Sequence, residues 1–309
     1  MKVEIGLNMK TPQIAAKPFV KWAGGKGQLL AKIQRKYPSE LGKNINRYCE
    51  PFVGGGAVFF DILSHFDLQE ILINDVNVEL INSYQQIQNH VENFLNQLQA
   101  LQNSFLSLEY QDRKAYYYEK RERFNYLKVH GDKQVNLEKA VLFIFLNKTC
   151  FNGLYRVNRQ GLFNVPMGAY KNPNIYDEKN LIFINKLLKN VTIKCGDYKD
   201  CLPFINENTF VYIDPPYRPI TETSSFTTYS ENRFDDIEQI ALGKFVDTIH
   251  DTGAKVIISN SDPKNTDEND EFFDELYKSY YIHRITAKRM INCNGESRGN
   301  IRELLVSNY

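Results

Sequence analysis

The stretch that most constrains the fold is Val-Tyr-Ile-Asp-Pro-Pro-Tyr at residues 211–217. Its first three residues are apolar and of β-branched or aromatic types, which predicts a buried strand. Because prolines cannot donate to a central ladder, the chain must leave the sheet directly after Asp214. This strand therefore carries a carboxylate to its C-terminal end, where open α/β sheets bind their ligands.

The residues after this strand have the chemistry of a nucleobase receptor. The Asp214 carboxylate and the Pro215 carbonyl can accept hydrogen bonds from an exocyclic amino group, and Tyr217 offers a flat face to a ring. Pro216 stiffens the turn. The alternative is a common Pro-Pro turn whose aspartate serves only as a cap. The other motifs of the chain favour the receptor.

Two further strands are predicted before this one, and each ends in a feature suited to a cofactor. Residues 46–61 predict a strand, a turn with three glycines at 54–56 and a helix, which lets a cofactor approach the backbone closely. Residues 71–74 predict a second strand that ends at Asp75, 21 positions after Gly54. At this spacing an acid meets the ribose hydroxyls of an adenosine moiety. The alternative for Asp75, which does not exclude the first role, is the N-cap of the next helix.

Residues 18–27 form another glycine turn, and Lys26 lies in it just before a helix expected over 28–37. A nucleotide P-loop is excluded because that motif needs Gly at 20 and Ser or Thr at 27, where the chain has Val20 and Gly27. The glycines at 54–56 are not followed by a phosphate cradle either. These features predict an adenosine cofactor without a pyrophosphate. S-adenosylmethionine fits, because Lys26 or the helix N-terminus can meet its carboxylate; the alternative is a plain turn before a surface helix.

A helical insertion is predicted between the second and third strands. Residues 78 to about 147 carry apolar side chains at helical spacing, and residues 151–166 then alternate around a polar turn, which predicts a β-hairpin. The hairpin lies within 139–176, a stretch without any Asp or Glu in a chain whose formal net charge is only +1. A two-stranded ribbon with arginines and amides suits the DNA major groove. The alternative is an exposed hairpin with basic residues by chance.

Strands and helices alternate again after about residue 180. The triplet Gly-Asp-Tyr at 196–198 follows a strand and offers a second edge to an adenine ring. Residues 221–230 predict a loop over the site, and the acidic residues 262–275 predict a solvated loop and the start of a helix, without chemistry. The remaining expected elements are strands at 191–195, 255–260, 280–287 and 303–309, a helix at 235–250, and a connection from Lys288 to Arg302 that holds Arg289 and Arg298.

The cysteines and the hydropathy pattern exclude several classes of protein. Five cysteines are scattered without any Cys or His ligand spacing, which argues against a zinc site and fits reduced thiols. No apolar run reaches the roughly 20 residues of a membrane span. With no signal peptide in view, the sequence predicts a cytoplasmic protein without metal or membrane association.

Four motifs in this order resemble those of the Dam-type DNA adenine methyltransferases, which have the α arrangement of amino-methyltransferases. The motifs are Lys-Trp-Ala-Gly-Gly-Lys at 21–26, Glu-Pro-Phe-Val-Gly-Gly-Gly at 50–56, the hairpin at 151–166 and Asp-Pro-Pro-Tyr at 214–217. The resemblance implies an α/β fold: a Rossmann-like methyltransferase sheet with an inserted helical target-recognition subdomain that carries the hairpin. It further implies S-adenosylmethionine as methyl donor, S-adenosylhomocysteine as product, and double-stranded DNA as partner. The nearest type methylates a flipped adenine within GATC.

The residues and the resemblance together assign three groups of site residues and two domains. The catalytic group is Asp214, Pro215 and Tyr217. The cofactor-binding group is Trp22, Lys26, Phe52, Gly54, Gly56, Asp75, Asp197, Tyr198 and Asp214. The DNA-binding group is Lys21, Phe151, Asn152, Leu154, Arg156, Arg159, Pro166 and Tyr170. The catalytic domain is expected at 1–77 and 177–309, and the target-recognition domain at 78–176.

The predicted reaction is direct transfer of a methyl group to the exocyclic amino nitrogen of adenine, without a metal or a covalent intermediate. One rival keeps this chemistry but acts on RNA or on a protein amide; Asp rather than Asn at 214 and the basic hairpin argue against it. A second rival is a non-catalytic DNA-binding relative, which the intact set of Lys26, Asp75, Asp214 and Tyr217 argues against. The sequence leaves open whether a companion restriction endonuclease exists.

Overall fold

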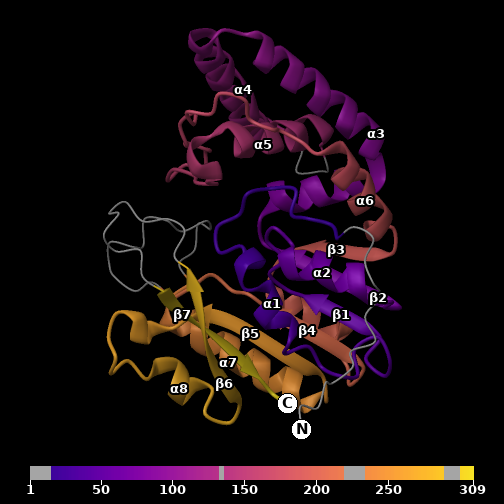
Figure 1. Ribbon diagram of the computed structural model, residues 1–309, viewed down its shortest axis with the longest axis vertical. Helices are drawn as coiled ribbons and strands as arrows, with labels where there is room; N and C mark the ends of the chain where they lie inside the picture. The colour runs from indigo at the N-terminus through magenta and orange to yellow at the C-terminus, as the bar shows by residue number, and fades with distance from the viewer. Residues whose placement is uncertain (1–14, 132–135, 219–233, 289–299) are drawn as a thin grey trace.

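The predicted strands assemble into one sheet. A computed structural model describes residues 15–131, 136–218, 234–288 and 300–309, and within these it forms a seven-stranded sheet in the order β3-β2-β1-β4-β5-β7-β6 (Figure 1). The strands are β1 (Arg47–Glu50), β2 (Glu70–Asp75), β3 (Val191–Cys195), β4 (Thr209–Ile213), β5 (Lys255–Ser261), β6 (Tyr281–Lys288) and β7 (Asn300–Ser307).

The strand order creates a switch point between β1 and β4. Strands β1 to β5 are parallel, whereas β7 runs antiparallel to both β5 and β6. From β1 the chain moves outward through β2 to β3, and from β4 it moves the opposite way to β5. Such a Rossmann-like sheet opens a crevice outside the carboxyl ends of the two central strands. The predicted α/β fold and the terminal antiparallel pair are confirmed.

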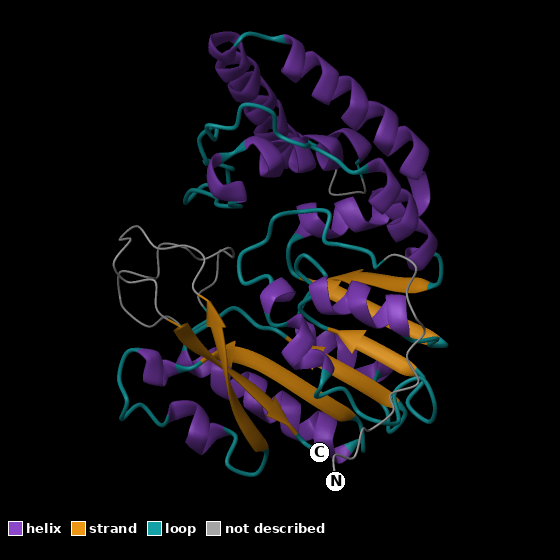
Figure 2. Ribbon diagram, in the orientation of Figure 1, coloured by secondary structure: helices purple, strands orange, loops and turns teal. Residues whose placement is uncertain are grey.

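Both faces of the sheet are covered, which explains why all five residues of β4 are buried. Phe210 and Tyr212 join an apolar cluster on one face, while Val211 and Ile213 join a second cluster on the other. Helices lie on both sides of the strands in Figure 2. They are η1 (Lys26–Gln28), α1 (Leu30–Gln34), α2 (Ala57–His65), α6 (Glu178–Leu188), η3 (Tyr198–Phe204), α7 (Asp236–Asp251), η5 (Pro263–Asn265) and α8 (Phe272–Leu276).

The predicted helical insertion consists of α3 (Val78–Ser107), α4 (Tyr110–His130) and α5 (Leu137–Thr149), at the top of Figure 1. Helix α3 begins against the sheet, where Gln88 Nε2 donates to the Val191 carbonyl, and leaves it past a non-helical residue, His90. Its apolar face and that of α5 belong to the same cluster as one face of the sheet. The helical layer is therefore packed continuously onto the catalytic half.

The predicted β-hairpin at 151–166 folds back on itself but forms no regular strands. It contains a short 3₁₀ turn, η2 (Phe151–Gly153), and the isolated bridge Val157↔Phe163. The expected antiparallel turn is present, because the Asn158 N–H bonds the Leu162 carbonyl and the Asn164 N–H bonds the Arg156 carbonyl. The outward-facing backbone groups are held by α4: Asn125 bonds both the N–H and the carbonyl of Phe163, and Tyr117 Oη donates to the Val165 carbonyl. The segment is therefore an irregular hairpin loop anchored on α4, shorter than the ribbon expected over 151–166.

The acidic stretch 262–275 contains the expected helix start, at α8, but it is not simply solvated. Asp262 is fully buried and pairs with Arg284 Nε at 3.0 Å and Arg302 Nε at 3.4 Å. A buried carboxylate needs such partners, so this stretch holds the terminal strands together. The helix expected over 28–37 is also shorter, because regular α-helix there is confined to α1.

Some expectations fall outside the described residues, namely the loop at 221–230 and the arginines Arg289 and Arg298. In the part of the chain that the structure describes, no helix is long and apolar enough to cross a membrane.

Candidate active site

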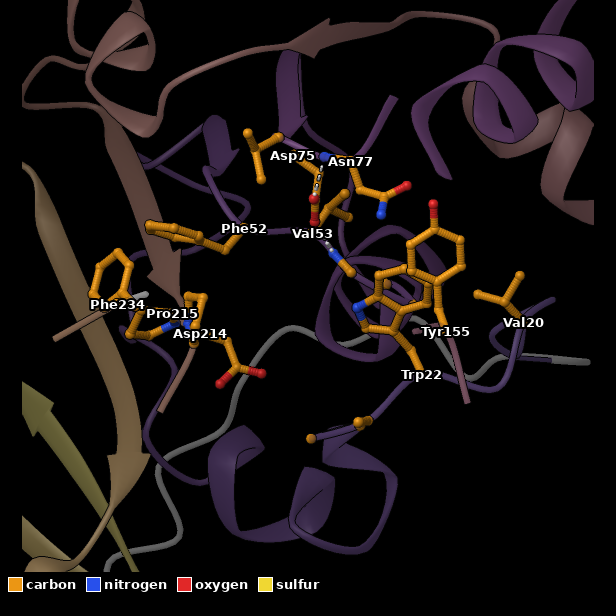
Figure 3. A pocket seen from close by; sticks show the side chains of 18 of the residues that line it. Val20, Trp22, Phe52, Val53, Asp75, Asn77, Tyr155, Asp214, Pro215 and Phe234 are labelled. Atoms are coloured by element: carbon orange, nitrogen blue, oxygen red, sulfur yellow. Dashed lines mark hydrogen bonds between the residues drawn. The ribbon is translucent and has the colours of Figure 1, made fainter. Parts of the chain in front are cut away.

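A cavity of about 1270 Å³ opens at the switch point, beneath the helical layer. The carboxyl ends of β1, β2 and β4 contribute its floor, and residues 160–162 of the loop on α4 reach its upper wall. All nine predicted cofactor residues line it, together with Pro215 and Tyr217. In Figure 3 the Asp214 carboxylate projects into the open space between the Phe52–Phe234 side and the Trp22–Tyr155 side.

The floor is a glycine turn fixed by an acid. Asp75 Oδ2 accepts from the Gly54 amide at 3.0 Å, and Asp75 Oδ1 accepts from the Asn77 amide at 2.9 Å. Burial raises the pKa of Asp75 from its usual value. A Cβ at Gly54, whose φ is 48°, would lie 2.9 Å from the Trp22 ring, so only glycine fits this cradle. The N-cap of α3 is Asn77 rather than Asp75, because the Asn77 side chain accepts from the Leu80 amide.

Aromatic rings form two opposite walls. Phe52 stacks on Tyr198 with 5.2 Å between ring centroids, and Phe234 meets Phe52 edge-on at 6.0 Å. Opposite them, Trp22 stacks on Tyr155 at 5.8 Å. Flat apolar walls above a carboxylate that accepts hydrogen bonds suit a planar ring with attached hydroxyl groups. Phe234 and Tyr155 were not among the predicted site residues.

Asp214 is held in place from two sides. Its Oδ1 accepts from Ser259 Oγ at 2.9 Å and lies 2.7 Å from Lys26 Nζ. Lys26 is only 3% exposed, and its ammonium also donates to the Tyr217 hydroxyl and to the Gly24 carbonyl. An ammonium has three hydrogens, and these three partners account for all of them. The expected contact of Lys26 with a cofactor carboxylate is therefore not supported by this geometry.

Three consecutive residues of the turn after β4, at 216–218, form hydrogen bonds to side chains of distant elements. The Tyr217 hydroxyl donates to Glu303 Oε2 at 2.9 Å, and the Pro216 carbonyl accepts from the buried Gln239 side chain at 3.1 Å. Arg218 binds Asp236 with two nitrogens and Asp270 with a third. Burial raises the pKa of Tyr217 well above its usual value and also raises that of Glu303. The result is a rigid acceptor site at the cavity floor.

Residues 22–291 match the family described as D12 class N6 adenine-specific DNA methyltransferase. The chain belongs to this family.

The curated relatives of this D12 class methyltransferase carry matching names. A "Type II methyltransferase M.MjaIII" from Methanocaldococcus jannaschii is 47% identical over 295 residues, covering 95% of this chain and 99% of that protein. The "Type II methyltransferase M1.LlaDCHI" from Lactococcus lactis is 37% identical, covering 96% and 97%. A "DNA adenine methylase" from Haemophilus influenzae is 31% identical, covering 96% and 94%. The D12 class protein is thus an adenine-specific DNA methyltransferase, which implies a methyl donor of the S-adenosylmethionine type.

The residues that we expect at the DNA do not line the cavity: Lys21 belongs to the first motif, and the other seven lie on the loop at 151–170. The Asn147 side chain binds the Lys21 backbone through both its donor and its acceptor and also donates to the Gly153 carbonyl, so it joins the first motif to this loop. Lys21 Nζ lies 4.4 Å from the Tyr170 ring centroid. Arg156 Nε donates to Asn164 Oδ1 at 2.8 Å. Phe151, Asn152, Arg159 and Pro166 are exposed, and Leu154 is half-buried.

Within residues 15–131, 136–218, 234–288 and 300–309, no group of three or more His, Cys, Asp or Glu side chains could hold a metal ion.

Proposed function

We propose that the cavity binds S-adenosylmethionine, with the adenosine between Phe52, Tyr198 and Phe234 and the ribose hydroxyls on Asp75. Both Asp75 oxygens already accept one amide hydrogen each and keep a lone pair for a hydroxyl. Asp197, whose Oδ1 accepts from the Lys199 amide, is fixed beside the Tyr198 ring. The bound cofactor supplies a methyl group on a sulfonium, which needs no further activation.

The target amine is held by Asp214 and the Pro215 carbonyl. The observation that carries this proposal is the orientation of Asp214 at the cavity floor by Lys26 and Ser259, which occupy Oδ1 and leave Oδ2 for a substrate amine. Acceptors that bond the NH₂ hydrogens of adenine favour a pyramidal, nucleophilic nitrogen and stabilise the positive charge that develops on it. Fixing both reactants in line supplies the proximity contribution.

We propose that the adenine reaches this site by flipping out of the duplex. Asp214 lies at the floor of the cavity, whereas the loop at 151–170 forms the outer rim, so a base inside a helix cannot reach it. Extrusion costs a few kcal/mol, and stacking on Tyr217 would return about 1–3 kcal/mol. Residues 78–176 would act as the target-recognition part and residues 1–77 and 177–309 as the catalytic part.

The recognition sequence is proposed to be GATC, on the motif resemblance of the loop at 151–166. The names of the two type II relatives support a second proposal, that this enzyme protects DNA against a companion restriction endonuclease. Methylation of plasmid DNA by the pure protein, followed by digestion with adenine-methylation-sensitive restriction enzymes, maps the modified sites. If the methylated plasmid resists cleavage at restriction sites that do not contain GATC, the proposed recognition sequence is wrong.

Asp214→Ala tests the assigned chemistry. We expect transfer of tritiated methyl groups to duplex DNA to be abolished while the affinity for S-adenosylmethionine stays within about tenfold of the wild type. Retained activity would refute the role of Asp214. In parallel, an excess of unlabelled RNA should not compete with duplex DNA for methylation.

A further inference from the structure

Glu303 belongs to none of the motifs that mark the active site, yet it reaches the catalytic turn. It lies on β7, where its backbone is paired with Ser261 of β5 on one side and Ile285 of β6 on the other. Its side chain is only 13% exposed. A residue paired on both sides within a sheet has little freedom to move, so Glu303 presents its carboxylate from a fixed position.

The carboxylate of Glu303 ends a chain of contacts that starts at Asp214. Lys26 Nζ lies 2.7 Å from Asp214 Oδ1 and donates to the Tyr217 hydroxyl at 2.6 Å. That hydroxyl donates its own hydrogen to Glu303 Oε2 at 2.9 Å, and Lys26 Nζ is 3.9 Å from the same oxygen. Since Tyr217 accepts from Lys26 and donates to Glu303, its hydroxyl has a single orientation that satisfies both partners.

The charges of this cluster also depend on Glu303. One ammonium lies between two carboxylates, all three largely shielded from water. With Glu303 ionised, the cluster carries a net charge of −1; without it, Lys26 neutralises Asp214 alone and the net charge is zero. Methyl transfer moves positive charge from the donor sulfur to the amine beside Asp214, and a preorganised negative site stabilises that charge.

We propose that Glu303 is a positioning residue for methyl transfer: it fixes the Tyr217 ring and Lys26 against Asp214 and keeps the cluster negative. The inference rests on the proposed roles of Asp214 and Tyr217 and extends them to a residue on another strand, 86 positions along the chain from Tyr217.

The test compares Glu303→Gln and Glu303→Ala with wild type by single-turnover methyl transfer at saturating DNA and donor. The glutamine variant would keep an acceptor for Tyr217 but lose the charge, so we expect a rate loss of about tenfold; the alanine variant loses both, and we expect about 10²-fold or more. Donor and DNA affinities should stay within about threefold of wild type. The matched control is Glu268→Gln, which neutralises an exposed carboxylate paired with Arg302, the neighbour of Glu303, and should leave the rate unchanged.

A double-mutant cycle separates positioning from a general structural effect. Tyr217→Phe removes the hydroxyl through which Glu303 acts, so the loss caused by Glu303→Ala should be smaller in that background than alone. Three outcomes would each overturn the inference. The first is fully additive rate losses in the double variant, and the second is rates of both Glu303 variants within twofold of wild type. The third is a rate loss that only follows a loss of donor affinity or of folded protein. The Asp214→Ala variant in the same assay tells two failures apart. If it is inactive, any of these three outcomes rules out only the role of Glu303. If it is active, the proposed function itself is wrong.

Discussion

The turn at 214–218, which we expect to hold the target amine, and the tip of the loop at 151–170 are both short polar stretches, but they are held by different kinds of contact. In the turn, side chains from distant elements hold Asp214, Tyr217 and Pro216, and they are respectively Ser259 from β5, Glu303 from β7 and Gln239 from α7. In the loop, the tip is held by its own side chains, as when Asn158 Oδ1 accepts from two amides within the loop. The turn is therefore a product of the whole fold, whereas the loop tip is a local structure.

This difference has a functional consequence. A substitution in the turn disturbs a charge cluster that spans several elements, so it should affect the rate of chemistry. A substitution at the loop tip breaks contacts within a few residues, so it should change which DNA is bound while the fold survives.

The largest effect on the rate of methyl transfer is expected for Lys26→Met, and Lys21→Met is its counterpart near the loop. The two lysines are five positions apart, but Lys26 is 3% exposed between two carboxylates, whereas Lys21 is exposed beside Tyr170, where we expect the DNA. Removing the buried cation should lower the single-turnover rate by about 10²–10³-fold and destabilise the fold by about 2–3 kcal/mol after allowing for partial exposure of its partners. Lys21→Met should instead weaken DNA binding and reduce its salt slope by about one. Similar kinetic losses in both variants would contradict the distinction.

Arg156→Ala should change specificity without changing stability. Arg156 is exposed on the loop, and loss of a guanidinium that reads a guanine costs about 1–3 kcal/mol of discrimination at one base pair. The measurement is the ratio of kcat/KM for duplexes that differ at each position of the target site. Arg159→Ala is the control and is expected to weaken binding to all sequences alike. If Arg156→Ala did the same, Arg156 would be a phosphate contact.

The same contrast explains what the sequence could predict. The ends of parallel strands meet at one edge of a sheet, so Asp75 and Asp214 could be brought together from strand patterns alone, and both line the cavity. Ser259 and Glu303 could not be found in this way. They come from β5 and β7, whose places beside β4 in the sheet are tertiary properties, and neither residue lies in a local motif.

Partners distant in sequence account for two departures from the local patterns. Alternating residues at 151–166 predicted a hairpin, and the chain does turn back there, but the outward-facing backbone groups of Phe163 bind the Asn125 side chain of α4 and only one bridge joins Val157 to Phe163. The acidic stretch was expected to be solvated, but Asp262 is buried by arginines of β6 and β7. In each case the partner lies on an element that the local sequence does not identify.

Gly153→Ala tests the junction between the loop at 151–170 and the first motif, where Lys21 lies. Gly153 has a φ of 64°, and an added Cβ would lie 2.3 Å from Lys21 Cδ. The backbone strain costs about 1–2 kcal/mol, and the flexible Lys21 side chain must move away from Tyr170. We expect a lower midpoint of thermal unfolding together with weaker DNA binding. Gly27→Ala, where a Cβ would meet nothing within 4 Å, is the control for stability; equal midpoints for both variants would show that the junction tolerates the strain.

Asn164→Ala should have the smallest effect and the most local one. Asn164 Oδ1 accepts from Arg156 Nε at 2.8 Å, and the backbone N–H of Asn164 donates to the Arg156 carbonyl at 3.1 Å. The side-chain bond holds the guanidinium by its inner nitrogen and leaves the two outer nitrogens to face a base. Its loss should reduce discrimination at the position read by Arg156 by about 0.5–1.5 kcal/mol, with no change at other base pairs. Because Asn164 acts through Arg156, the double variant should discriminate no worse than Arg156→Ala alone. Additive losses in the same kcat/KM ratios would mean that Asn164 contacts the DNA independently.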